Sequence, residues 1–128
     1  MIKVVEVLPG QEPVIKDVPS LYGPYGQELF GESRRDHAKL GNDLYLAVGD
    51  SAALTGKPVN FTLSFGSALV SVCGPAIFVT RVWESGGETF DEYKSLLAGE
   101  AAAIVELLRR DRNQFNPSEL HTLLGWEI

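Results

Sequence analysis

The stretch CGPAIFVTRVW, residues 73–83, carries the strongest β-strand signal in the chain. Its β-branched and aromatic residues favour an extended backbone, and the Gly-Pro pair before them sets a turn. Two similar segments, Thr62–Phe65 and Ala68–Val72, come just before this stretch and predict two more strands. The middle of the chain is therefore predicted to be a run of strands joined by short turns.

Two further β-branched segments, Ile2–Leu8 and Val14–Val18, lie near the N-terminus. The sequence PGQEP between them has turn residues, so a hairpin or two adjacent strands are predicted. Asp43–Val48 predicts another strand, which stops at the following Gly-Asp pair. Proline and glycines before it permit at most a short helix, Tyr25–Phe30. Together these segments predict a mostly antiparallel sheet of about five strands.

The apolar pattern changes in the last third of the chain. Apolar residues recur there every three or four positions, which predicts an amphipathic helix from about Phe90 to Arg110. A second, shorter helix is predicted to begin at Asn116, an N-cap residue followed by proline, and to end at Gly125. These segments form the helical tail of the chain.

The length of 128 residues fits one domain. We predict an α+β fold for this single domain, with a sheet-rich segment at residues 1–87 and a helical tail at 88–128. The apolar band of the long predicted helix is broader than one small sheet needs, so we also predict a homo-oligomer, most simply a dimer.

The composition is that of an acidic folded protein, with a net charge of -6 and 45% hydrophobic residues. Its apolar runs are far shorter than the ~20 residues that cross a bilayer, so no membrane association is expected. A single cysteine and an N-terminus without a signal sequence favour the cytoplasm. The acidity argues against direct binding of nucleic acid, although it permits mimicry of nucleic acid by carboxylates.

Several catalytic motifs fail on inspection of the sequence. The segment GDSAALTGKP, residues 49–58, has Ser51 and Pro58 where a phosphate-binding loop needs glycine and a hydroxyl residue. No Gly-x-Ser-x-Gly elbow is present, and Cys73 closes an apolar run, which predicts a buried structural thiol. The two histidines and the cysteine lack metal-ligand spacing. We therefore expect no enzyme, no catalytic residue, no metal and no cofactor.

The stretch GESRRDHAKLG, residues 31–41, concentrates positive charge in an acidic chain. One interpretation is a solvated face, in which Glu32 and Asp36 pair with the cations at helical spacing. The other is an anion site, because adjacent arginines beside glycines aim bidentate donors at phosphate or carboxylate. The candidate ligand-binding residues are Arg34, Arg35, His37, Lys39 and Asn60.

Three short motifs occur in order along the first two thirds of the chain: VLPGQEP at residues 7–13, LTGKPVN at 54–60 and VCGPAIFV at 72–79. In order and spacing they resemble the landmarks of the domain of unknown function 3846 family, small proteins found mostly in bacteriophages, plasmids and other mobile elements. The resemblance covers about residues 1–85. The family has no established catalytic residues, so no site is transferred, and the tail beyond residue 87 departs from its shorter members.

The resemblance implies a function through its biological setting. Small non-enzymatic phage proteins often counter host defence, so it implies an anti-defence protein in the bacterial cytoplasm that sequesters a small anionic host molecule, such as a nucleotide signal. The alternative is an inhibitor that binds a host protein directly, through its acidic surface or through aromatic anchors. The candidate anchors are Tyr22, Tyr25, Trp83 and Trp126. A small nucleotide-processing enzyme is the third hypothesis.

Overall fold

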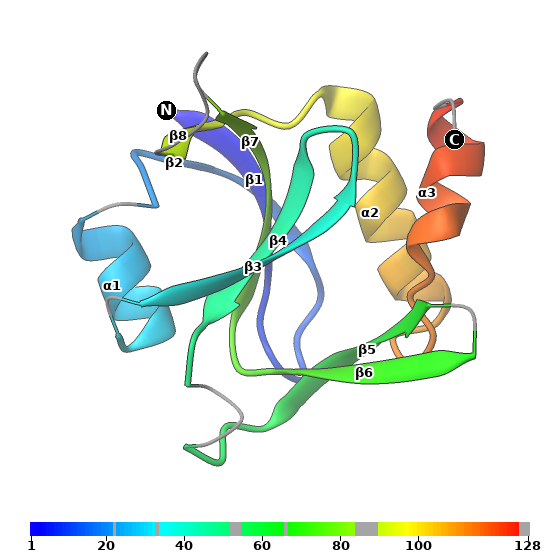
Figure 1. The fold of residues 1–128 in the computed structure, drawn as a ribbon, viewed down its shortest axis with the longest axis horizontal. Helices are drawn as coiled ribbons and strands as arrows, with labels where there is room; N and C mark the ends of the chain where they lie inside the picture. Colours follow the sequence, from blue (N-terminus) through cyan, green and yellow to red (C-terminus); the bar gives the residue numbers. More distant parts are fainter. Residues whose placement is uncertain (22, 33, 52–54, 66, 84–89, 126–128) are drawn as a thin grey trace.

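The computed structural model describes residues 1–21, 23–32, 34–51, 55–65, 67–83 and 90–125, and these form an α+β fold (Figure 1). The strands of this part of the chain are β1 (Ile2–Val7), β2 (Val14–Val18), β3 (Arg35–Gly41), β4 (Leu44–Gly49), β5 (Val59–Phe65), β6 (Ala68–Cys73), β7 (Ala76–Trp83) and β8 (Phe90–Lys94). The helices are α1 (Pro24–Phe30), α2 (Ala98–Arg110) and α3 (Pro117–Leu124).

Six of the strands form one antiparallel sheet in the order β2-β1-β7-β4-β3, with β8 added beside β7. The remaining strands, β5 and β6, form a separate antiparallel hairpin. The predicted α+β class and antiparallel sheet are confirmed. The main sheet has six strands where about five were predicted. Strands β3 and β8 were not predicted, and the two predicted strands at 62–65 and 68–72 form the separate hairpin.

Strand β7 is the centre of the main sheet. It pairs with β4 along one edge and shares its other edge between β1 and β8. Its first four residues, Ala76–Val79, are fully buried. A strand covered on both faces reads as a continuous apolar run, which explains the strong sequence signal of this stretch.

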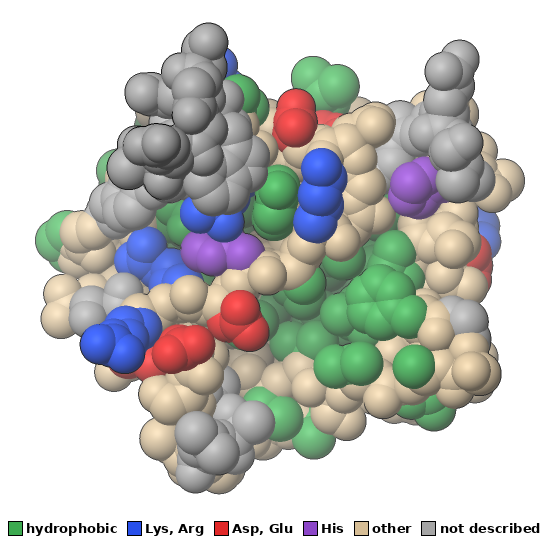
Figure 2. Space-filling model, in the orientation of Figure 1, with side chains coloured by type: hydrophobic (Ala, Val, Ile, Leu, Met, Phe, Trp, Pro, Cys, Tyr) green, Lys and Arg blue, Asp and Glu red, His purple; other side chains and the backbone are tan. Residues whose placement is uncertain are grey.

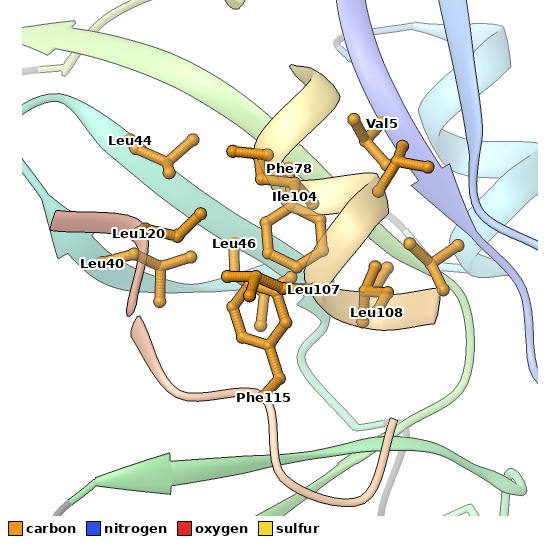
Figure 3. Close-up of a cluster of buried hydrophobic side chains, with 14 of the residues drawn as sticks. Val5, Leu40, Leu44, Leu46, Phe78, Ile104, Leu107, Leu108, Phe115 and Leu120 are labelled. Atoms are coloured by element: carbon orange, nitrogen blue, oxygen red, sulfur yellow. The ribbon is translucent and has the colours of Figure 1, made fainter. Parts of the chain in front are cut away.

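The larger core lies between one face of the main sheet and a layer made of α2, α3 and the hairpin β5–β6 (Figures 1 and 3). Phe78 of β7 contributes the sheet side of this core, with Leu44 and Leu46 of β4. Ile104 and Leu108 of α2 pack against them. Sheet and helices therefore share one hydrophobic core, which includes residues from both the N-terminal segment and the predicted tail.

Among the described residues, the opposite face of the sheet is only partly covered. Helix α1 packs there through Phe30, which shares a smaller core with Val4, Ile77 and Val79. Figure 1 shows α1 on the far side of the sheet from α2 and α3. Strand β3 and the second half of β7 extend beyond α1 on this face.

The prediction of a helix from Phe90 was wrong, because Phe90–Lys94 is strand β8 and α2 begins only at Ala98. Strand β1 pairs with β7 only at residues 76–78 of β7. The second half of the same edge of β7 is therefore open to another strand, and β8 pairs there. Pairing with this edge outweighs the local helical periodicity. Helix α2 then starts where Glu100 Oε1 accepts the backbone N–H of Leu97 at 2.8 Å.

The apolar band of α2 is covered within the chain. Ala101, Ile104, Leu107 and Leu108 are all buried in the main core. This band therefore does not supply the free surface from which a dimer was predicted, and the oligomeric state stays a prediction. None of the described helices has the length and apolar content that crossing a bilayer requires.

The second helix of the tail matches its prediction. Asn116 caps α3 by accepting the backbone N–H of Ser118 at 2.9 Å, and Gly125 ends it with a left-handed φ of 67°. Pro117 occupies the first turn, as its sequence position suggested.

The prediction that Cys73 is buried was wrong. Cys73 is half-buried at the end of β6, which pairs with β5 along one side only. The apolar run that ends at Cys73 belongs to an edge strand of a hairpin, and Leu69 and Val70 in that run are also exposed. Apolar composition alone does not distinguish such an edge strand from a buried one.

Candidate functional site

The basic stretch forms strand β3 and not a helix, so the i, i+3 and i, i+4 pairing considered for it does not apply. Alternation along a strand places Arg35, His37 and Lys39 on one face of the sheet. Glu32 binds Ser51, accepting the hydroxyl at 2.7 Å and the backbone N–H at 3.2 Å. This contact fixes the turn that enters β3 against the end of β4.

Arg81 of β7 and Tyr93 of β8 extend the same face of the sheet. The two residues lie opposite each other in the β7–β8 pairing. The Tyr93 hydroxyl lies 2.6 Å from Nε2 of His37, and the two rings stack with centroids 5.8 Å apart. Long-range strand pairing thus joins a residue from position 37 to residues from positions 81 and 93.

Aromatic rings support both arginine side chains of this cluster. The guanidinium of Arg81 lies 5.6 Å from the ring centroid of Tyr45, and that of Arg35 lies 5.6 Å from the ring centroid of Phe30. Gly26 of α1 leaves room for Arg35, since a side-chain carbon added at Gly26 would collide with Nη2 of Arg35. We call Arg35, His37, Arg81 and Tyr93 the Arg-His cluster.

The Arg-His cluster changes the protonation of its histidine. Burial, followed by the positive charges of Arg81 and Arg35, lowers the pKa of His37 from 6.5 to about 4, while Asp36 acts weakly in the opposite direction. The imidazole is therefore uncharged at neutral pH. The positive charge of the cluster then resides on its two arginines.

The pKa of His37 predicts a pH-dependent stability. Between pH 6.5 and 4 the unfolded chain binds more protons than the folded chain at this residue, so the free energy of unfolding falls as the pH falls through this range. Solvent screening at a half-buried site reduces the effect to about 1–2 kcal/mol. Urea titrations of the native protein and of His37→Gln at several pH values measure it. The native protein should lose more stability than the variant below pH 6.5, whereas parallel losses in both proteins would exclude this effect.

The structure brings some of the predicted ligand-binding residues together and separates others. Arg35 and His37 meet in the Arg-His cluster, and Lys39 lies further along the same face, opposite Tyr45. Arg34 precedes β3 and is exposed. Asn60 lies on β5, outside the cluster.

Asn60 makes structural contacts within the protein. It is 6% exposed, and its Nδ2 donates to the carbonyl oxygens of Val7 at 2.8 Å and Gly74 at 2.9 Å. Its Oδ1 accepts Nη2 of Arg112 at 2.5 Å. Both ends of the amide are thus occupied by protein groups, so we omit Asn60 from the candidate site.

Sequence reasoning missed Arg81 and Tyr93. The sequence did contain a signal for Arg81, because Arg81 is the only charged residue in the apolar stretch 73–83. Tyr93 was hidden by the mistaken helix, because its position on a strand depends on pairing with β7. Neither residue is near the basic stretch in the sequence, so their meeting with His37 depends on the sheet order.

The predicted aromatic anchors are only partly visible. The hydroxyl of Tyr25 donates to Glu6 Oε2 at 2.5 Å, and burial followed by this contact raises the pKa of Tyr25 well above its usual range. Tyr22, Trp126 and the side chain of Trp83 lie outside the described residues. Within the described part of the chain, no group of three or more potential metal ligands is gathered.

Comparison of the chain with protein-family models, with curated proteins and with solved structures finds no match. The resemblance to a family of phage and mobile-element proteins therefore stays a prediction. The Arg-His cluster remains the feature of the described residues with the clearest chemical character.

Proposed function

We propose that this protein is a non-enzymatic binding protein that holds a small phosphate-bearing molecule at the Arg-His cluster. One observation carries the proposal: Arg35 and Arg81, from two different strands, lie on the same face of the sheet as His37, and each guanidinium lies 5.6 Å from an aromatic ring centroid. Burial, followed by the charges of these two arginines, lowers the pKa of His37. Guanidinium groups bind phosphate oxygens with two parallel hydrogen bonds, and aromatic rings beneath them hold their planes in place. A neutral imidazole between them adds a further hydrogen-bonding group without adding charge.

The charge of the whole chain favours a small ligand over a polymer. The net charge is -6, so a long polyanion would meet repulsion from the rest of the surface. A small anion feels mainly the local field, because charges beyond ~10 Å are screened at physiological salt. A nucleotide fits this requirement, whereas DNA or RNA does not.

The biological role that we propose is sequestration of a nucleotide signal in the cytoplasm of a bacterial host, as an anti-defence activity of a phage or mobile element. Support for this setting comes from the motif resemblance, and support for the ligand class comes from the Arg-His cluster. Sequestration needs tight binding and no turnover. Two well-formed arginine contacts of about 1.5–3 kcal/mol each provide a large share of such affinity.

Substitution of the two arginines tests the proposal. Arg35→Gln and Arg81→Gln should each weaken binding of ADP-ribose or a cyclic dinucleotide at least about tenfold, since ~1.4 kcal/mol is a factor of ten. Calorimetry on the native protein and the variants measures this. Arg109→Gln is the matched control, because Arg109 is an exposed arginine paired with Glu12 at 3.1 Å on another part of the surface. Equal losses in all three variants, or no binding by the native protein, would overturn the proposal.

The pKa of His37 gives an independent readout of the same site. A bound phosphate offsets the charges of Arg35 and Arg81, so the pKa of His37 should rise from about 4 toward its ordinary value when the ligand is present. NMR titration of the His37 ring with and without ligand follows this change. A ligand that binds without moving this titration lies elsewhere on the protein.

A second function, direct inhibition of a host protein, is favoured by a different surface. The hairpin β5–β6 exposes four large apolar side chains, with exposed fractions from 43% to 64%. These are Val59, Phe65, Leu69 and Val70. Phe65 and Val70 lie on the same face of the hairpin and Leu69 lies on the opposite face. Exposed apolar patches mark contact surfaces on soluble proteins.

A further inference from the structure

A groove of about 210 Å³ lies between strand β3 and the hairpin β5–β6. One wall is formed by residues 36–38 of β3 and the other by residues 70–73 of β6. Leu46, Val48 and Leu63 lie between the walls and give the groove an apolar floor. In Figure 2, hydrophobic side chains gather in this hollow and acidic side chains lie at one end of it.

Both walls of the groove are edge strands. In the described residues, β3 pairs only with β4, and β6 pairs only with β5. An edge strand presents backbone N–H and C=O groups that can accept another strand. On β3, the carboxylate of Asp36 accepts the backbone N–H of His37 at 2.9 Å, which occupies part of that edge. The β6 edge is therefore the better template.

The groove is too small for a nucleotide-sized molecule. Sites for drug-sized ligands typically enclose ~300–1,000 Å³, so this space suits one or two side chains of a longer segment that continues outside it. Val70 lines the groove, and Phe65 lies on the same face of the hairpin, so it extends the contact surface beyond the groove itself. The dimensions thus favour a peptide segment over a free small molecule.

The charge of the groove specifies its occupant further. Asp36 and Asp50 line it, and no lysine or arginine of the described residues does so. Neither carboxylate takes part in an ion pair among the described residues. An occupant that carries lysine or arginine would complement these two charges.

We propose that this groove binds an extended, basic segment of a partner protein, which adds a strand to the free edge of β6. Its apolar side chains contact Leu46, Val48 and Leu63, and its lysine or arginine side chains face Asp36 and Asp50. In this mode of recognition, backbone hydrogen bonds provide the affinity, and every second side chain of the bound segment provides the specificity. A second copy of this chain fits less well, because residues 68–73 of β6 contain no basic residue and the net charge of -6 repels another copy.

Peptides of defined charge test the proposal. The probes are eight-residue acetylated peptides that alternate valine with lysine, or valine with glutamate. An exposed ion pair changes affinity about two- to fivefold, so two of them predict about tenfold tighter binding of the lysine peptide. Fluorescence anisotropy measures both peptides against the native protein and against the double variant Asp36→Asn, Asp50→Asn. In the double variant, the ratio of the affinities for the lysine peptide and the glutamate peptide should fall to near one. Both substitutions are at exposed positions, so they leave folding intact.

The thiol of Cys73 locates the binding event. Cys73 is the only cysteine and lines the groove, so a bulky maleimide attached there should block the lysine peptide. The control is Cys73→Ser combined with Glu28→Cys, which places the same group on α1. Arg81→Gln should keep peptide binding, because Arg81 does not line the groove, although His37 of the Arg-His cluster does.

Each other outcome overturns the proposal. Equal binding of the two peptides, no binding of either, or an unchanged preference in the double variant would exclude an acidic peptide groove. Self-association that competes with the lysine peptide, measured by light scattering, would assign the groove to a second copy of the chain.

Discussion

Replacing Asn60 with alanine should lower the free energy of unfolding by about 3 kcal/mol, the cost of leaving two or more buried polar groups without partners. The substitution removes the donor to the carbonyls of Val7 and Gly74 and the acceptor for Arg112. Urea denaturation measures the loss, and a thermal scan should show a decrease of about 10 °C for a domain of this size.

The effect is large because Asn60 joins several distant segments. Arg112, which binds the side-chain oxygen of Asn60, also donates to the carbonyls of Gln11 and Leu8. The turn after β1, the start of β5 and the segment after α2 thus meet around one amide. Removal of Asn60 leaves the Arg112 guanidinium without one of its acceptors in a half-buried position.

Asn116→Ala is the matched control for Asn60→Ala. Asn116 also accepts a backbone N–H, but it does so at the half-exposed start of α3, where loss of the cap costs about 1 kcal/mol. The folded Asn60→Ala protein should bind nucleotides as the native protein does. A nearly neutral effect on stability, or a selective loss of ligand binding, would return Asn60 to the candidate site.

Replacing Phe115 with alanine should cost about 3–5 kcal/mol, the usual range for removing a fully buried aromatic ring. Phe115 is 1% exposed, and its ring centroid lies 5.4 Å from that of Phe78 and 6.0 Å from that of Phe61. Figure 3 shows it beside Leu107 in the main core. Its backbone also exchanges hydrogen bonds with Thr62 and Ser64 of β5 at 2.9 Å. The ring therefore attaches the hairpin to the rest of the core.

Phe65→Ala supplies the comparison on the same hairpin. Phe65 is 43% exposed, so its removal should cost less than about 1 kcal/mol, a typical value for a surface substitution. Phe115→Leu should fall between the two, because it keeps part of the buried volume. Similar losses for Phe115→Ala and Phe65→Ala in chemical denaturation would contradict this account of the core.

Local sequence patterns predicted the elements that local chemistry specifies. The hairpin of β1 and β2 follows from β-branched runs around a Pro-Gly turn, and α3 follows from the cap at Asn116 and the stop at Gly125. The strand β7 follows from its continuous apolar run. Each of these signals is contained within about ten residues, so no knowledge of the tertiary structure is needed to read it.

The parts that could not be predicted depend on contacts between distant residues. Strand β8 forms because β7 has an open edge, which the sequence around Phe90 does not reveal. The Arg-His cluster needs His37, Arg81 and Tyr93 on one face, and only the sheet order brings them there. The predicted site therefore contained Arg35, His37 and Lys39 of β3 and omitted the cluster residues of the neighbouring strands. It also included Arg34 and Asn60, which lie outside the cluster.

The divided edge of β7 has a consequence for the time at which the protein folds during synthesis. The backbone of Lys3 bonds to the Ser95 hydroxyl and to the N–H of Leu96, so β1 and the end of β8 meet beside the same central strand. The sheet is completed only when residues 2–7 and 90–94 are both present, and the helices α2 and α3, which cover the face with the larger core, are synthesised after all the described strands. The N-terminal strands therefore keep apolar surface uncovered until α2 and α3 have been synthesised, and a chaperone that shields nascent chains can act on them during that time.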